Sequence, residues 1–247
     1  MASRMHIGTS GWHYSHWRGP FYPEDMRDDK MLDFYVRHFQ TVEINNSFYR
    51  LPSEQTFNSW RDQTPSGFTF AVKASRYITH MKKLKDPEST SQKFFAHAEA
   101  LKKKIGAILF QLPPSWHINV DRLQAFLEAL PGSHRYAFEF RDPTWFNRQV
   151  IDLLKKHHAA FCVYDLAGQQ SPKELTARFA YLRLHGPAEQ KYSGRYTRPQ
   201  LQKWLELCTE WLHGGAKQVF VYFDNDQSGY AALNAMELQE MAARAGL

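Results

Sequence analysis

Polar and charged side chains alternate with apolar ones in several short, β-type segments of this 247-residue chain. In TVEINNSFYR (41–50), Val42 and Ile44 occupy one face of an extended segment, and Glu43 occupies the other. Asn45 falls on the same face as Glu43. A carboxylate and an amide placed together could bind a polar substrate or move a proton, provided that their face meets a cavity rather than bulk water.

The same alternation recurs in later segments. In FEFR, Glu139 and Arg141 oppose two phenylalanines, and in LRLH, Arg183 and His185 oppose two leucines. The other polar positions that alternate with, or close, an apolar run are Lys73, Gln111, Asp224 and Asn225. Carboxylates, cations and amides therefore share a defined strand face in at least six segments.

Eight β-rich runs must position these residues. They are predicted at 5–10, 41–46, 68–74, 106–112, 136–141, 160–165, 179–185 and 218–225. Helical patterns are predicted at 29–39, 54–62, 89–104, 119–130, 147–157, 198–213 and 230–245, with Ser53, Asn119 and Thr197 as N-caps. After the sixth run, GQQSPKEL shows only a short helical start.

One strand–helix unit in roughly 31 residues is typical of repeated β-α units. We therefore predict a single (β/α)8 TIM-like barrel domain spanning residues 1–247. An open doubly wound sheet would more often carry a Gly-rich fingerprint after its first strand, and none is present. In a barrel, the polar alternating positions point inward, near the carboxyl ends of the strands where barrel enzymes catalyse. These side chains then either form a polar pocket that faces a ligand, or they only pair with one another through hydrogen bonds and ion pairs.

Such a pocket favours an enzyme that acts by carboxylate acid/base chemistry on a small polar substrate, either anionic or sugar-like. Glu43 or Glu139 would transfer the proton, while Lys73 and His185 complete the predicted catalytic set. Hydrolase and isomerase chemistry both remain open. The predicted substrate-binding residues are Asn45, His80, Gln111, Arg141, Arg183, Tyr192, Asp224 and Asn225.

Two loops would deliver further cations to this rim. HGPAEQKYSGRYTR and DNDQSG follow the seventh and eighth runs, so we expect an anion, such as a phosphate-bearing substrate, near Arg183, His185, Lys191 and Arg195. Asp224 would oppose that anion. No cofactor is predicted. A divalent metal is an alternative, because His80 and His185 with the acids form a mixed nitrogen–oxygen donor set, although no ligand spacing supports it.

The composition sets the remaining expectations. A net charge of +6, basic clusters at 82–85 and 102–104, and aromatic residues near the barrel mouth support a nucleic-acid-binding or endonuclease-like alternative. No apolar run is long enough for a membrane span. Cys162 and Cys208 are too few for a disulfide framework, so a reduced, cytoplasmic protein is expected. The sequence indicates no oligomeric state.

The motifs GTSGW, TVEINNSFYRLPS, FAVKASRYITH, ILFQLPPSW, FEFRDPTW, YLRLHG and VYFDND closely resemble the YecE-like family, domain of unknown function 72. The resemblance covers about residues 6–240. It implies a TIM-like barrel distantly similar to sugar isomerases and apurinic-site endonucleases, and it adds Tyr49 to the site residues. The family usually has two asparagines where this chain has Asp224 and Asn225, a change expected to affect metal affinity or substrate choice.

Overall fold

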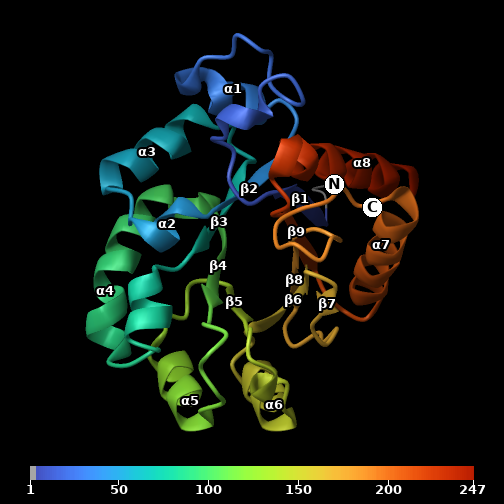
Figure 1. Ribbon diagram of the computed structural model, residues 1–247. Helices are drawn as coiled ribbons and strands as arrows, with labels where there is room; N and C mark the ends of the chain where they lie inside the picture. The colour runs from blue at the N-terminus through green and yellow to red at the C-terminus, as the bar shows by residue number, and fades with distance from the viewer. Residues whose placement is uncertain (1–3) are drawn as a thin grey trace.

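In the described part of the chain, residues 4–247, eight parallel strands form the inner wall of an α/β domain in this computed structural model (Figure 1). They are β1 (Met5–Thr9), β2 (Thr41–Ile44), β3 (Thr69–Lys73), β4 (Ile105–Gln111), β5 (Tyr136–Glu139), β6 (Ala160–Leu166), β8 (Phe179–Leu184) and β9 (Gln218–Phe223). Their order is β1-β9-β8-β6-β5-β4-β3-β2. All eight predicted strands are present, and the barrel is nearly closed.

Helices surround these strands in Figure 1, which views the barrel along its axis. They are α1 (Met31–Tyr35), α2 (Asn46–Tyr49), α3 (Glu54–Gln63), α4 (Pro87–Ala98), α5 (Val120–Ala129), α6 (Arg148–Lys156), α7 (Arg198–His213) and α8 (Tyr230–Arg244). Ser53 and Asn119 cap α3 and α5 by accepting backbone N–H bonds, and Thr197 forms a capping box on α7, as predicted. Within residues 4–247, no helix is long and apolar enough to cross a membrane.

One connection differs from the repeated unit. Between β6 and β8 the chain forms β7 (Gln169–Gln170), which pairs with β6 in antiparallel fashion, instead of the short helical start that the sequence predicts. Ala167 and Gly168 both have positive φ (51° and 75°), as a two-residue type I′ hairpin turn requires. A turn that tight reverses the strand direction at once, so no helix can begin there.

Strands β1 and β2 close the barrel without a regular ladder. Gly11 donates its N–H to the Glu43 carbonyl at 2.8 Å, beside an isolated bridge between Ser10 and Glu43. Below this bridge, the Tyr35 hydroxyl accepts from the Thr9 N–H at 3.0 Å and donates to the Thr41 carbonyl at 3.1 Å. A side-chain hydroxyl thus satisfies the backbone groups that a ladder would pair.

The barrel interior is packed below its carboxyl end. Its buried side chains are small on β3 to β6, mostly alanine, and large and aromatic on β8 and β9. They are Ala71, Ala107, Leu109, Ala137, Ala160, Cys162, Phe179, Tyr181, Phe220 and Tyr222. The aromatic rings of β8 and β9 fill the space left by the alanines. A packed layer of side chains therefore closes the barrel interior beneath the polar residues.

Candidate functional site

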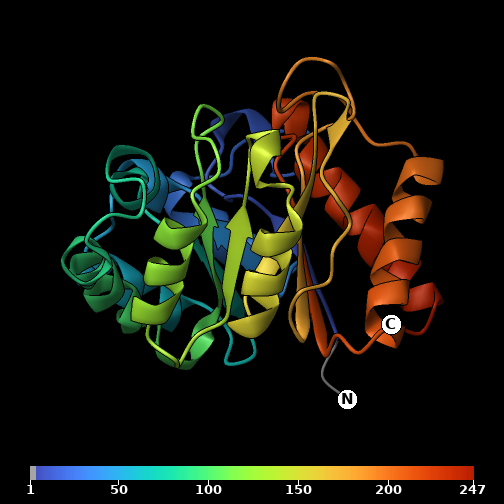
Figure 2. The same cartoon turned by 90° about the horizontal axis from the view of Figure 1, so that it is seen from below.

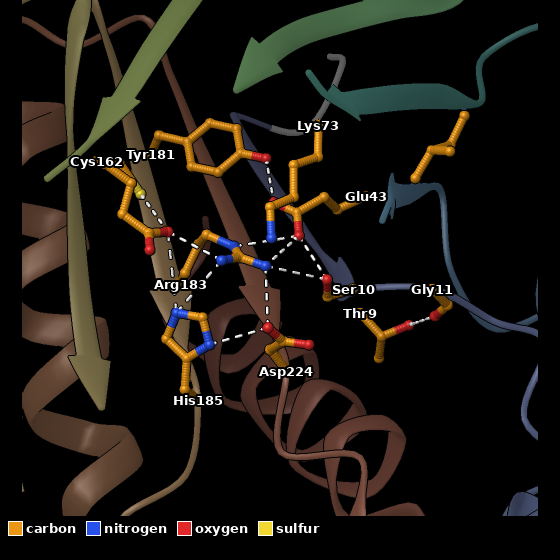
Figure 3. Close-up of polar contacts among 12 residues, drawn as sticks. Thr9, Ser10, Gly11, Glu43, Lys73, Cys162, Tyr181, Arg183, His185 and Asp224 are labelled. Atoms are coloured by element: carbon orange, nitrogen blue, oxygen red, sulfur yellow. Dashed lines mark hydrogen bonds and ion pairs between the residues drawn. The ribbon is translucent and has the colours of Figure 1, made fainter. Parts of the chain in front are cut away.

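Arg183 lies at the centre of a buried polar cluster at the carboxyl end of the barrel (Figure 3). Its Nε and Nη2 donate to Oε1 of Glu43 at 3.1 and 2.7 Å, and its Nη1 donates to Oε2 of Glu139 at 2.9 Å. Nη2 also donates to Oδ2 of Asp224 at 3.0 Å. Burial alone would lower the pKa of Arg183, but the three carboxylates raise it well above its ordinary value.

Glu43, on β2, has both carboxylate oxygens occupied. Besides Arg183, its Oε1 accepts from the Ser10 hydroxyl at 2.5 Å, and its Oε2 accepts from the Tyr181 hydroxyl at 2.6 Å. The Glu43 side chain is fully buried. Four hydrogen bonds hold this carboxylate in place, so Glu43 is better suited to fixing the position of Arg183 than to accepting a proton from a substrate.

Glu139, on β5, is held between two guanidinium groups. It accepts from Arg183 and from Nε of Arg141, whose guanidinium carbon lies 4.7 Å from the centre of the Tyr164 ring. Burial would raise the pKa of Glu139, but Arg141 and Arg183 together hold it well below its usual range. Glu139 is therefore ionised at neutral pH.

His185 and Asp224 form a second hydrogen-bonded pair. Nη2 of Arg141 donates to Nε2 of His185 at 3.0 Å, so the imidazole proton must sit on Nδ1, which donates to Oδ2 of Asp224 at 2.9 Å. Burial and then Arg141 and Arg183 hold the pKa of His185 well below its ordinary value, so this ring is neutral. Burial raises the pKa of Asp224, and its Oδ1 accepts no hydrogen bond from residues 4–247.

Lys73, at the end of β3, is 5% exposed and has no hydrogen-bond acceptor among the described residues. Its Nζ lies 4.3 Å from the centre of the Phe48 ring. Burial, and then the neighbouring Arg183, lowers the pKa of Lys73 to about 8, although the nearby carboxylates act in the opposite direction. An amine that titrates close to neutral pH is suited to proton transfer.

The charges of the cluster balance. Three cations (Lys73, Arg141 and Arg183) face three carboxylates (Glu43, Glu139 and Asp224), with His185 neutral. Three sites in these charged groups make no hydrogen bond within the described chain. They are Lys73 Nζ, Asp224 Oδ1 and an N–H group of Arg141. Across residues 4–247, no group of three or more His, Cys, Asp or Glu residues could hold a metal ion.

A groove of about 560 Å³ lies above the β1–β2 seam, where Gly11 and Asn45 follow Ser10 and Ile44, and none of the charged residues of the cluster lines it. Asn45 and Tyr49 line it, and the buried Oδ1 atom of Asn45 has no hydrogen-bond partner among residues 4–247. Trp12 and Trp60 meet edge to face in its wall, with ring centres 5.0 Å apart. Its other lining residues are Gly11, His13, Tyr14, Asp28, Asp29, Leu32, Asn46 and Gln63.

Four more predicted residues lie around the cluster without joining its ion pairs. Gln111 ends β4 in register with Glu139, and Nδ1 of His80 lies 2.9 Å from the Thr79 hydroxyl. Tyr192 packs edge to face on His185 in the β8–α7 loop. Asn225 points to that same loop, where its Nδ2 donates to the Gly194 carbonyl at 2.8 Å and to Asn234. Its buried Oδ1 has no partner in the described chain.

Sequence reasoning did not identify several residues of the site. Ser10 and Tyr181 hold Glu43, and Tyr14 and Trp60 line the groove together with Trp12, an aromatic residue that the sequence predicts near the barrel mouth. Tyr181 carried a usable signal, because it lies two residues before Arg183 and therefore shares its strand face. Trp60 carried none, since it lies on the outer helix α3, whose position depends on the whole fold.

The chain is similar to several known proteins. The family model described as "Protein of unknown function DUF72" matches residues 6–246. UPF0759 protein YunF of Bacillus subtilis is 29% identical, over 96% of this chain and 94% of YunF, and UPF0759 protein YecE of Escherichia coli O157:H7 is 34% identical, over 77% and 78%. A DUF72 family protein from Thermotoga maritima has a crystal structure that aligns with a TM-score of 0.89 at 29% identity, over 98% of this chain and 100% of its own. These names state a family and no activity.

Proposed function

This chain belongs to the DUF72 family, and we propose that it is an enzyme that transfers protons on a small, sugar-like substrate at the carboxyl end of its barrel. The observation that carries this proposal is Lys73, a buried amine with a pKa of about 8 and no hydrogen-bond acceptor in residues 4–247. At pH 7, about one molecule in ten then has a neutral amine that can accept a proton.

The proposed roles follow from which donors and acceptors are free. Glu43 and Glu139, the acid/base candidates of the sequence analysis, hold Arg183 instead, because their oxygens are already hydrogen-bonded. Lys73 is the acid/base group. Arg141, which keeps an N–H group free of protein acceptors, stabilises negative charge that develops on a substrate oxygen.

The groove favours the sugar-like substrate over the anionic one. Its walls combine aromatic rings, which pack on the apolar face of a sugar, with carboxylates and amides that bind hydroxyl groups. Asp28 and Asp29 would repel a phosphate there, and the donors of Arg183 are turned to the carboxylates of the protein itself. A proton moved next to a carbonyl group would make the reaction an isomerisation.

Deuterium exchange tests the reaction class. A panel of aldoses and ketoses, with and without phosphate groups, is incubated with the protein in D2O, and proton NMR follows loss of the proton next to the carbonyl. We expect exchange with at least one sugar, at a rate that rises with pH through about 8 as Lys73 loses its proton. Lys73→Met should lower the rate by about 100-fold or more.

Lys85→Met is the matched control, because Lys85 is an exposed lysine on the loop after β3 and should leave the rate unchanged. Treatment with borohydride distinguishes a second use of the same amine. A mass increase on Lys73 in the presence of sugar would show an imine, making the lysine a nucleophile. Absence of exchange with every sugar, together with no thermal shift, would refute the proposal.

Nucleic-acid binding at the same face is the second candidate, and one observation favours it. Of the five large apolar side chains that are most exposed in the described chain, four lie in the segments that follow the carboxyl ends of β2, β3 and β8. Tyr49, Tyr77 and Tyr192 could stack on bases, beside the basic residues at 82–85. Fluorescence anisotropy with a labelled single-stranded oligonucleotide tests this candidate: Tyr77→Ala should weaken binding about tenfold, and Met236→Ala, an exposed position within the outer helix α8, should not.

A further inference from the structure

A second cavity, of about 650 Å³, opens at the opposite end of the barrel, where the strands begin (the lower edge in Figure 2). Its lining residues are His134, Arg135, His158, Arg178, Phe179, Lys217 and Gln218. No aspartate or glutamate lines it. It is separated from the polar cluster at the other end by the packed interior of the barrel.

The strand order explains why these cations meet. Arg135, Arg178 and Lys217 each directly precede the first residue of a strand: β5, β8 and β9 respectively. Strands β9, β8, β6 and β5 are consecutive neighbours in the sheet, and His158 lies two residues before β6. Neighbouring strands are roughly 5 Å apart, so the four basic residues form an arc along the edge of the sheet.

The register places like charges directly side by side. Phe179 pairs with Gln218, so Arg178 and Lys217 are adjacent, and the Lys217 N–H donates to the Arg178 carbonyl at 2.7 Å. Ala137 pairs with Ala160, which places the imidazole-bearing residue His158 beside Arg135 at the same edge. Like charges opposite each other on neighbouring strands destabilise a sheet unless a counter-charge lies between them.

The protein supplies almost no counter-charge. Arg135, Arg178 and Lys217 form no ion pair with any residue between 4 and 247. Arg135 donates to the Gly106 carbonyl at 3.0 Å, which uses one of its N–H groups. The acid that approaches the cavity is Glu99, whose Oε1 lies 2.7 Å from Nε2 of His134. The two guanidinium groups and the ammonium group therefore keep most of their donors for an external acceptor.

We propose that this cavity binds a compact oligophosphate, a small molecule with at least two linked phosphate groups. Two guanidinium forks match phosphate oxygens in pairs, and Lys217 adds a third charge beside them. The cavity volume falls within the range of small-molecule sites, which favours a compact ligand over a long polymer. The site is independent of the proton-transfer chemistry proposed at the other end of the barrel.

Isothermal titration with inorganic tripolyphosphate in low salt tests the site on the full chain. We expect saturable 1:1 binding to wild type. Arg178→Gln and Lys217→Gln should each weaken it by about tenfold or more, because each removes a charge-assisted hydrogen bond. Both side chains are exposed, so neither change should prevent folding. Lys203→Gln, which removes the same charge from the outer face of α7, is the matched control and should bind like wild type.

Three results would overturn the proposal. The first is the absence of saturable binding to wild type. The second is equal weakening by Lys203→Gln, which would mean that tripolyphosphate responds only to net charge. The third is tighter binding of a short single-stranded oligonucleotide that the same two substitutions weaken, which would identify the ligand as a nucleic-acid backbone.

Discussion

The two ends of the barrel carry similar numbers of cations in opposite circumstances. At the carboxyl end, Lys73 and Arg183 are buried and Arg141 is partly buried, and three carboxylates balance them. At the other end, the cations beside β5, β8 and β9 are exposed, without an ion pair inside residues 4–247. Burial requires that opposite charges within the chain balance a charged group, whereas exposure leaves it free for a partner from outside.

Removing Arg183 should have the largest effect. Arg183→Met leaves Glu43, Glu139 and Asp224 in the interior without their shared cation. We expect the free energy of unfolding, measured in urea, to fall by about 3–5 kcal/mol or more. Arg178→Met, at the exposed end, should change it by less than about 0.5 kcal/mol. Similar losses for both substitutions would remove the contrast between the two ends.

Replacing Lys73 should instead stabilise the protein at neutral pH. The pKa of Lys73 is about 8 in the folded chain, whereas an unfolded lysine titrates near 10.4, so between these values the unfolded chain binds more protons. The stability of wild type therefore rises with pH across this window, by about 3 kcal/mol, relative to Lys73→Met. At pH 7 the variant should be the more stable protein by up to that amount.

Urea unfolding of both proteins between pH 7 and 10.5 measures this difference, which should shrink as the pH rises. Lys85→Met, an exposed lysine, should show no such trend against wild type. A constant difference between wild type and Lys73→Met would mean that the Lys73 amine is not perturbed in the folded state.

The hydrogen bond from Tyr181 to Glu43 tests the cluster more finely. Tyr181→Phe removes a buried donor that lies 2.6 Å from Oε2 of Glu43 and leaves that oxygen unsatisfied. The expected loss of unfolding free energy is about 1.5–3 kcal/mol, because the acceptor is charged. Tyr222→Phe on β9 is the matched control, since its hydroxyl lies 2.7 Å from the neutral Thr41 hydroxyl and should cost about 1 kcal/mol. Equal losses would show that the charge of Glu43 adds nothing.

The smallest effect is expected at the exposed end. Arg178→Gln relieves the repulsion between Arg178 and Lys217, so the unfolding free energy in low salt should rise by a few tenths of a kcal/mol. Added salt should abolish this gain, because exposed charges are screened within about 10 Å at 0.1 M. Thermal unfolding at two salt concentrations measures it. A loss of stability would indicate that Arg178 has a favourable partner.

Much of the architecture could be predicted from local patterns. Strand periodicity predicted all eight barrel strands, and their parity placed Glu43, Lys73, Glu139 and Arg183 on inward-facing positions. The helix caps at Ser53, Asn119 and Thr197 followed from residue type alone. The hairpin after β6 was missed, because GQQSPKEL contains a turn whose backbone angles the residue pattern did not reveal.

What the sequence by itself determined is which side chains face inward, since a strand alternates its faces every two residues whatever its neighbours are. Only the tertiary structure decided how those side chains pair. Arg183 reaches Glu43 across 140 residues of chain and Glu139 across 44, distances in sequence that no local period encodes. Those pairings depend on the stagger of strands around the closing barrel, and they leave Lys73 Nζ and one oxygen of Asp224 without a hydrogen bond inside residues 4–247.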